Sequence, residues 1–178
     1  MRSRAGPARK GSSPTRAKFR DPGRALCQYQ EEFLVVCPEC GGCGHIRTRR
    51  RDVSSEPSWV RNAWRMVCGE CGHFARWDWG DPSPWAGSGN DRPSGCGLPL
   101  WLQTMCRGRL LWAYNGRHLG DLSAFVEATD RGRGRDPDGG MATRSMLGAL
   151  PRWLIIAKNR PDVLRGLARL RKKLLGAG

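Results

Sequence analysis

Residues 37–41 read CPECG and residues 68–72 read CGECG, two Cys-x-x-Cys pairs in a chain of 178 residues. Two intervening residues allow a tight turn to direct both sulfur atoms of a pair at one metal ion. The glycine after each pair, Gly41 and Gly72, suits the left-handed backbone of such a turn. The spacing therefore predicts one structural Zn²⁺, held by Cys37, Cys40, Cys68 and Cys71.

Apolar runs around the two pairs indicate β-strands. Short β-favouring runs precede the pairs, at 33–36 and within 59–67, and an alternating run follows at 74–79. Two cysteine turns at the ends of antiparallel strands, joined by a long excursion, form a zinc ribbon. We therefore predict such a ribbon over residues 25–80.

Cys43 leaves an alternative ligand set open, because it repeats the spacing of the first pair. An iron–sulfur run would place its next cysteine at position 47, which is Arg47. Cys43 could still replace one cysteine of the first pair as a zinc ligand. His45 and His73 follow the pairs closely, but we expect them outside a shell that four cysteines complete.

The remainder of the chain predicts an α+β fold, in which a Trp-rich β-hairpin and C-terminal helices follow the ribbon. The apolar runs 98–105 and 110–114 predict the hairpin. Cys96 and Cys106 flank its first strand and could meet. Asn115 is suited to cap a helix with an apolar face formed by Leu119, Leu122, Phe125 and Val126.

Two further helices are predicted over 149–158 and 161–175, and leucines line one face of the second. Asn159 is a suitable cap for that second helix. The expected organisation is a disordered basic arm over 1–24, the ribbon over 25–80, the hairpin and its helix over 81–130, a linker over 131–140 and a basic helical segment over 141–178.

The charge of the chain is strongly positive, with 31 Lys and Arg against 16 Asp and Glu and a net charge of +15. Such a field favours phosphate-bearing partners or anionic membrane surfaces. Residues 1–24 contribute +7 of this excess and are expected to bury nothing. No apolar run is long enough to span a membrane, and no apolar stretch follows the basic start, so we do not expect that start to be a secretory signal. The sequence thus predicts a cytoplasmic protein without a membrane partner.

Arginines and tryptophans interleave in the predicted ribbon, which favours nucleic acid, DNA or RNA, or a nucleoprotein complex as the partner. Cations neutralise phosphates, and aromatic rings stack on unpaired bases. The opposing interpretation places the tryptophans in a small core and the arginines on a solvated face. The candidate contacts are Arg47, Arg49, Arg50 and Arg51 on the loop between the pairs, Arg61, Arg65 and Arg76 on or near strands, Trp85 in a Gly/Pro-rich loop, and Arg165, Arg169 and Lys172 on the last helix.

A second hypothesis is a protein-interaction adaptor that docks through the leucine face of the last helix. Catalysis is not expected. The chain has three histidines, and a Cys₄ shell leaves no open metal position for water.

The two cysteine pairs resemble those of bacterial proteins described as carrying a TFIIB-type zinc ribbon. The resemblance covers about residues 30–175 and includes WDWGD at 77–81, GLPLWLQT at 97–104, LWAYN at 111–115 and LPRW at 150–153. It implies a zinc-binding protein of unestablished role.

The chain departs from that family at the hairpin turn. A cysteine pair and a histidine are expected there, but residues 106–109 read CRGR, which puts a second metal site in doubt. Some similar proteins are labelled replication-restart helicases. This chain has no Gly-Lys dipeptide and therefore lacks the phosphate-binding loop of a helicase motor.

Overall fold

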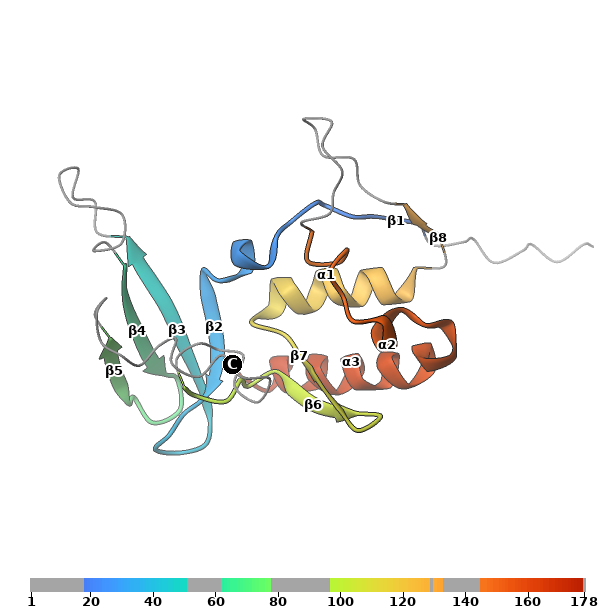
Figure 1. Ribbon diagram of the computed structural model, residues 1–178. Helices are drawn as coiled ribbons and strands as arrows, with labels where there is room; N and C mark the ends of the chain where they lie inside the picture. The colour runs from blue at the N-terminus through green and yellow to red at the C-terminus, as the bar shows by residue number, and fades with distance from the viewer. Residues whose placement is uncertain (1–17, 51–61, 78–96, 129, 133–144, 178) are drawn as a thin grey trace, which may run out of the picture.

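The main sheet has four antiparallel strands in the order β2-β3-β4-β5 (Figure 1). The computed structural model describes residues 18–50, 62–77, 97–128, 130–132 and 145–177. The strands are β2 (Glu32–Val36), β3 (Cys43–Arg50), β4 (Asn62–Cys68) and β5 (Phe74–Trp77). The strands predicted around the cysteine pairs are confirmed, and each pair lies at a turn between two adjacent strands.

The pairing register divides the sheet into an inner and an outer face. Phe33, Ile46 and Met66 are consecutive cross-strand partners, and each is at most 1% exposed. Side chains alternate between faces along a strand, so the residues next to these three point outward. The inner face packs with Tyr29, Leu100 and Tyr114 into the first hydrophobic core.

The edge of β2 that faces away from β3 is hydrogen-bonded to the segments that lead into and out of the hairpin. The Val36 N–H donates to the Pro99 carbonyl and the Leu34 N–H to the Tyr114 carbonyl, each at 2.8 Å. The hairpin comprises β6 (Gln103–Cys106) and β7 (Arg109–Trp112). Its two-residue turn has φ values of 52° at Arg107 and 71° at Gly108, as a tight hairpin turn requires.

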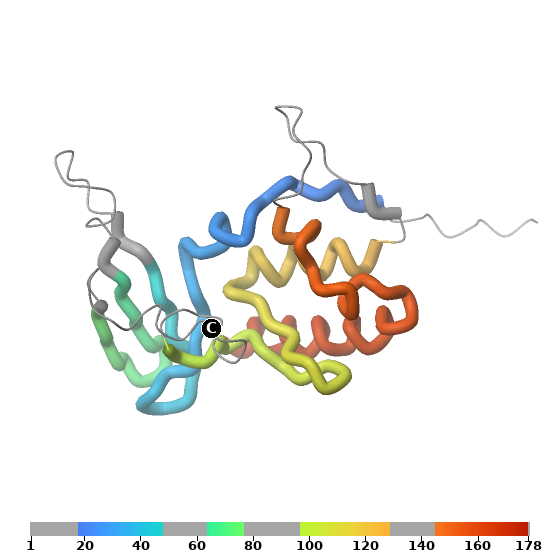
Figure 2. The backbone as a smooth tube through the Cα atoms, in the orientation of Figure 1, coloured from blue at the N-terminus to red at the C-terminus, as the bar shows by residue number. Residues whose placement is uncertain are grey.

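Two helices and the hairpin enclose a second core. The helices are α1 (Gly116–Glu127) and α3 (Arg160–Leu175), which lie side by side in Figure 2 and contact one another. On α3, Val163, Leu167 and Leu170 are at most 1% exposed, and they pack with Leu111 of the hairpin. The leucine face of α3 is thus buried within the chain.

The predicted cap of α1 is confirmed. The Asn115 side-chain oxygen accepts a hydrogen bond from the His118 N–H at 3.0 Å. Its amide nitrogen also donates to the carbonyls of Tyr29 and Glu32, at 2.8 and 2.9 Å. One buried side chain therefore joins the start of α1 to the segment that enters the ribbon.

The helix predicted over 149–158 is broken. The structure has the short α2 (Arg152–Ile155) and a single 3-10 turn, η2 (Ala157–Asn159), with extended backbone at Ile156. Asn159 occupies the N-cap position of α3, but its side chain makes no cap hydrogen bond, and its amide nitrogen donates to the Trp153 carbonyl at 2.8 Å. That bond satisfies a carbonyl at the end of α2 and holds the break.

The expectation of a disordered arm over 1–24 does not hold for residues 18–24. Here β1 (Lys18–Arg20) pairs in parallel with β8 (Asp130–Gly132), and the 3-10 turn η1 (Leu26–Tyr29) follows β1 in the chain. Phe19 packs edge-on against Phe125, with ring centroids 5.9 Å apart. Residues 1–17 and most of the linker predicted over 131–140 lie outside the described residues. None of the helices within the described ranges is long and apolar enough to cross a membrane.

Candidate metal centre

The two cysteine turns have the same backbone geometry. In the first, the Cys37 N–H donates to the Gly42 carbonyl at 2.8 Å, and the Gly41 N–H donates to the Cys37 carbonyl at 3.0 Å. The corresponding bonds of the second turn join Cys68 to residue 73 at 2.9 Å and residue 72 to Cys68 at 3.1 Å. The glycines at 41 and 72 have φ values of 74° and 71°, which confirms the predicted left-handed positions.

The four sulfur atoms of the two turns converge on one point. Short contacts cross between the turns, at 3.8 Å from Cys37 Sγ to Cys71 Sγ and 3.6 Å from Cys40 Sγ to Cys68 Sγ. All four sulfur atoms lie within 4.8 Å of one another. Zinc–sulfur bonds of about 2.3 Å at tetrahedral corners place the sulfur atoms roughly 3.8 Å apart. The cluster fits a single zinc ion.

The pKa values of two clustered thiols, Cys68 and Cys40, are shifted in opposite directions. Hydrogen bonds from the backbone N–H groups of Cys71 and then Glu70 lower the pKa of Cys68 to about 7. The Gly42 N–H lowers the pKa of Cys40, but the neighbouring thiols and burial outweigh it and raise that pKa to about 12. Thiols this close resist ionising together, and a divalent cation removes that resistance. Four sulfur ligands complete the shell, which is the pattern of a structural site.

Cys43 is not part of the cluster, so the alternative ligand set is not the one that the structure forms. Its side chain is 2% exposed and belongs to the second core, beside Leu34. Burial raises the pKa of its thiol to about 11. Its backbone N–H donates to the Glu70 carboxylate at 3.4 Å, which links the two turns.

The histidines near the pairs lie outside the sulfur cluster, as expected. His45 Nδ1 is 3.1 Å from the Glu32 carboxylate. Cys106 is buried at the hairpin turn, and burial raises the pKa of its thiol. Cys96 lies outside the described residues, so its pairing with Cys106 stays a prediction.

The outer face of the sheet brings three of the candidate arginines together. Arg47, Arg65 and Arg76 are consecutive cross-strand partners on β3, β4 and β5, and Glu32 precedes them on β2. We call these three arginines the arginine row. Arg47 donates to the Glu32 carboxylate at 2.8 Å, although its side chain stays 70% exposed. Burial would raise the pKa of Glu32, but the hydrogen bonds from His45 and Arg47 outweigh it and lower that pKa.

Arg65 is the central residue of the arginine row. It is half-buried, and its Nε atom is buried without a hydrogen-bond partner among the described residues. Arg76 is exposed on β5, at the outer edge of the sheet.

The other candidate contacts do not form one surface with the arginine row in the described residues. The prediction that Arg47, Arg49 and Arg50 lie on a loop is wrong, because β3 extends to Arg50. The side chains of Arg49 and Arg50, and the whole of Arg51, Arg61 and Trp85, lie outside the described residues.

The basic residues of α3 are partly committed to contacts within the chain. Arg165 pairs with Asp162, and Arg169 donates to the Met105 carbonyl at 3.0 Å. Lys172 is exposed. Arg169 thus holds α3 on the hairpin, and this patch carries less free charge than the sequence indicates.

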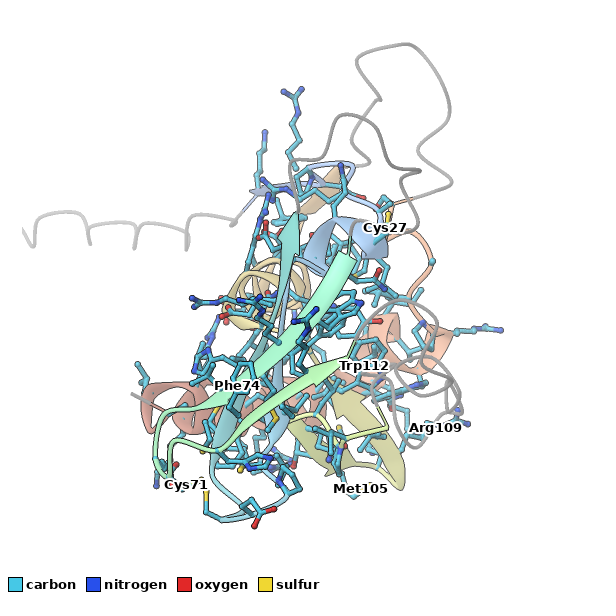
Figure 3. All side chains as sticks on the ribbon, turned by 90° about the vertical axis from the view of Figure 1, so that its left-hand side faces the viewer. Cys27, Cys71, Phe74, Met105, Arg109 and Trp112 are labelled. Atoms are coloured by element: carbon cyan, nitrogen blue, oxygen red, sulfur yellow. The ribbon has the colours of Figure 1, made fainter. Side chains whose placement is uncertain are left out.

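The tryptophans with described side chains support the core interpretation. Trp64 is 7% exposed, and Trp101, Trp112 and Trp153 are half-buried against the two cores. Instead, Phe74 is 56% exposed on the outer face, opposite Val67 at 50%. In Figure 3, Phe74 lies on one side of the sheet, Trp112 lies on the other, and Cys71 lies at its end. The alternation of Phe74 and Arg76 along the strand is the sequence signal for this face. The sequence-based prediction instead considers the tryptophans as the aromatic contacts.

His118 lies on α1 at the boundary of the two cores and lines a cavity of about 730 Å³ beside Trp112, Leu150 and Trp153. It is 3% exposed, and its Nδ1 accepts a hydrogen bond from the Tyr114 N–H at 3.2 Å. Burial lowers the pKa of His118 to about 4, and the nearby Asp121 only partly opposes this. The imidazole is therefore neutral and structural at physiological pH.

The evidence for the α+β architecture and for the metal centre is the geometry described above. Comparisons with protein-family models, with curated proteins and with solved structures find no match for this chain.

Proposed function

We propose that this zinc-binding chain is a non-catalytic nucleic-acid-binding protein, and that its contact surface is the outer face of the ribbon sheet. The observation that carries the proposal is the arginine row, in which Arg47, Arg65 and Arg76 follow one another across three strands. Neighbouring strands lie about 4.8 Å apart, so the three side chains start within roughly 10 Å of one another.

Like charges directly opposite one another on neighbouring strands destabilise a sheet. The carboxylate in this row is that of Glu32, at one end of it, and it pairs with Arg47. The row therefore carries more positive than negative charge. A phosphate backbone has the complementary charge to this row, and the net charge of +15 adds long-range attraction to it.

The zinc site gives this face its rigidity. Cys37 and Cys40 belong to the turn between β2 and β3, and Cys68 and Cys71 to the turn between β4 and β5. One ion ties both hairpins together at the same end of the sheet. The arginine row is thereby held in place before a partner arrives, which lowers the entropic cost of binding.

The test replaces Arg47, Arg65 and Arg76 by Gln, which removes the charge and keeps much of each stem. We expect weaker binding to all nucleic-acid sequences and a salt dependence that is lower by about one unit for each phosphate that an arginine no longer neutralises. The matched control is the triple Gln variant of Arg165, Arg169 and Lys172, the competing basic patch. The readout is fluorescence anisotropy at several salt concentrations, with zinc content and thermal midpoint checked for both variants.

A wild-type protein that binds no nucleic acid at low salt would overturn the proposal. The adaptor hypothesis would then take its place. Its leucine face is already buried by the hairpin and by α1, so such a partner would have to use another surface of the chain. Binding to a protein partner with an affinity that does not change with salt concentration would identify the adaptor case.

A further inference from the structure

We infer that the outer face of the sheet selects single-stranded over double-stranded nucleic acid, by stacking an unpaired base on Phe74. This inference rests on the proposed function and names the substrate class of the same surface. The observation behind it is that Phe74 is exposed beside the arginine row. Binding of phosphates by charge alone would not require an exposed aromatic ring there.

Phe74 and Val67 form an apolar step next to the arginine row. They are direct cross-strand partners on β5 and β4, and they are 56% and 50% exposed. Arg65 and Arg76 are the next outward-facing pair on the same two strands. The ring is thus about two residues, or roughly 7 Å, from the guanidinium-bearing positions.

The cross-strand row that contains Phe74 and Val67 is buried at its other end. Leu34 and His45 continue this row onto β2 and β3, and Leu34 is 3% exposed because the second core covers it. The β4–β5 half of the face has no such cover in the described part of the chain, and Phe74 there is 56% exposed. The exposed Phe74 thus shares the uncovered half of the face with Arg65 and Arg76.

The chemistry of the two neighbours matches one ligand. A phenyl ring offers a flat face, which stacks on the face of a base, and arginines bind the phosphates that link successive bases. In a duplex, the bases are stacked on one another and present only their edges in the grooves. Phe74 can therefore add to the binding of a single strand but not to that of an intact duplex.

The experiment measures binding of a mixed-sequence single strand of about 12 nucleotides, as DNA and as RNA, and of the DNA duplex of the same length. We expect the wild type to bind the single strand more tightly. Phe74→Ala should weaken single-strand binding about tenfold and leave duplex binding unchanged, because it removes one base–aromatic stack. Phe74→Tyr should restore most of the affinity, whereas Phe74→Leu, which keeps an apolar side chain without a ring, should not.

Met105→Ala is the matched control, since Met105 is a large apolar side chain of similar exposure, 59%, on the hairpin rather than on this face. It should leave both affinities unchanged. Equal affinity for single strand and duplex, with no effect of Phe74→Ala, would overturn this inference and leave the proposed function standing. Absence of binding to either would overturn the proposed function itself. Because Phe74 is exposed, all three of its variants should fold, and their zinc content and thermal midpoints verify this.

Discussion

The sulfur atoms of Cys40 and Cys68 lie 3.6 Å apart, although the two cysteines are 28 positions apart along the chain. This contact joins the turn between β2 and β3 to the turn between β4 and β5. Holding four thiols together at one point costs free energy, and a metal ion bound between the two turns offsets that cost.

We expect the purified protein to contain about one zinc per chain and to lose the structure of the ribbon when a ligand is removed. Structural zinc of this kind contributes roughly 10–16 kcal/mol of apparent binding free energy, more than a small core replaces. Cys37→Ser and Cys71→Ser should therefore release zinc, as measured by elemental analysis, and abolish the cooperative unfolding transition.

Cys43→Ser is the control, because Cys43 is a buried cysteine next to the site but outside the sulfur cluster. It should keep the zinc and lose only the modest stability of a buried thiol. A protein that remains fully folded after chelation would contradict the prediction.

The metal ligands could be predicted because their signal is local. Two residues between cysteines and a glycine after them determine the turn, whatever surrounds it, and the structure has Gly41 and Gly72 in the predicted conformation. The cap at Asn115 was predictable for the same reason. Its two bonds to the carbonyls of Tyr29 and Glu32 were not, since they join segments more than 80 residues apart.

The arginine row shows where sequence reasoning ends. Arg47, Arg65 and Arg76 align only in the register of β3, β4 and β5, and that register follows from the cysteine turns and from how far each strand extends. A polar, arginine-rich stretch after residue 46 reads as a loop, yet cross-strand hydrogen bonds carry β3 to residue 50. Likewise, the exposure of Phe74 depends on which half of the face the helices cover.

Asn115→Ala should destabilise the protein by about 2–4 kcal/mol. It removes a helix cap, worth about 1 kcal/mol, and leaves two carbonyls without their donor, at about 1–3 kcal/mol for the two together because the bond to Glu32 is only partly buried. Asn115→Ser keeps an acceptor for the His118 N–H and loses only the two amide bonds. The difference between the Ser and Ala variants in urea denaturation therefore measures the cap, and equal stability of both would show that the cap contributes nothing.

Deletion of residues 1–24 should lower the thermal midpoint by about 4–8 °C. It removes the ring contact between Phe19 and Phe125, the bond from the Met146 N–H to the Arg24 carbonyl and the ion pair of Arg24 with Asp121. The first two are worth about 2 kcal/mol together, and each kcal/mol shifts the midpoint of a protein of this size by about 2–4 °C. A second deletion, of residues 1–17, separates the contribution of residues 18–24, and equal midpoints for the two deletions would contradict their role.

His118 should make the protein less stable in acid. Its pKa is lowered from about 6.5 to about 4 in the folded state, because the buried imidazole resists protonation. Between these two values the unfolded chain binds more protons than the folded one, so the stabilising contribution is complete above about pH 6.5. It is lost progressively as the pH falls to about 4, by roughly 3 kcal/mol in all.

His118→Asn keeps an acceptor for the Tyr114 N–H and does not titrate. The other titratable groups are the same in both proteins, so the difference between the two curves of unfolding free energy against pH reports on His118. We expect the wild type to be more stable at pH 7 and to lose this advantage towards pH 4, and parallel curves would show that the imidazole titrates normally.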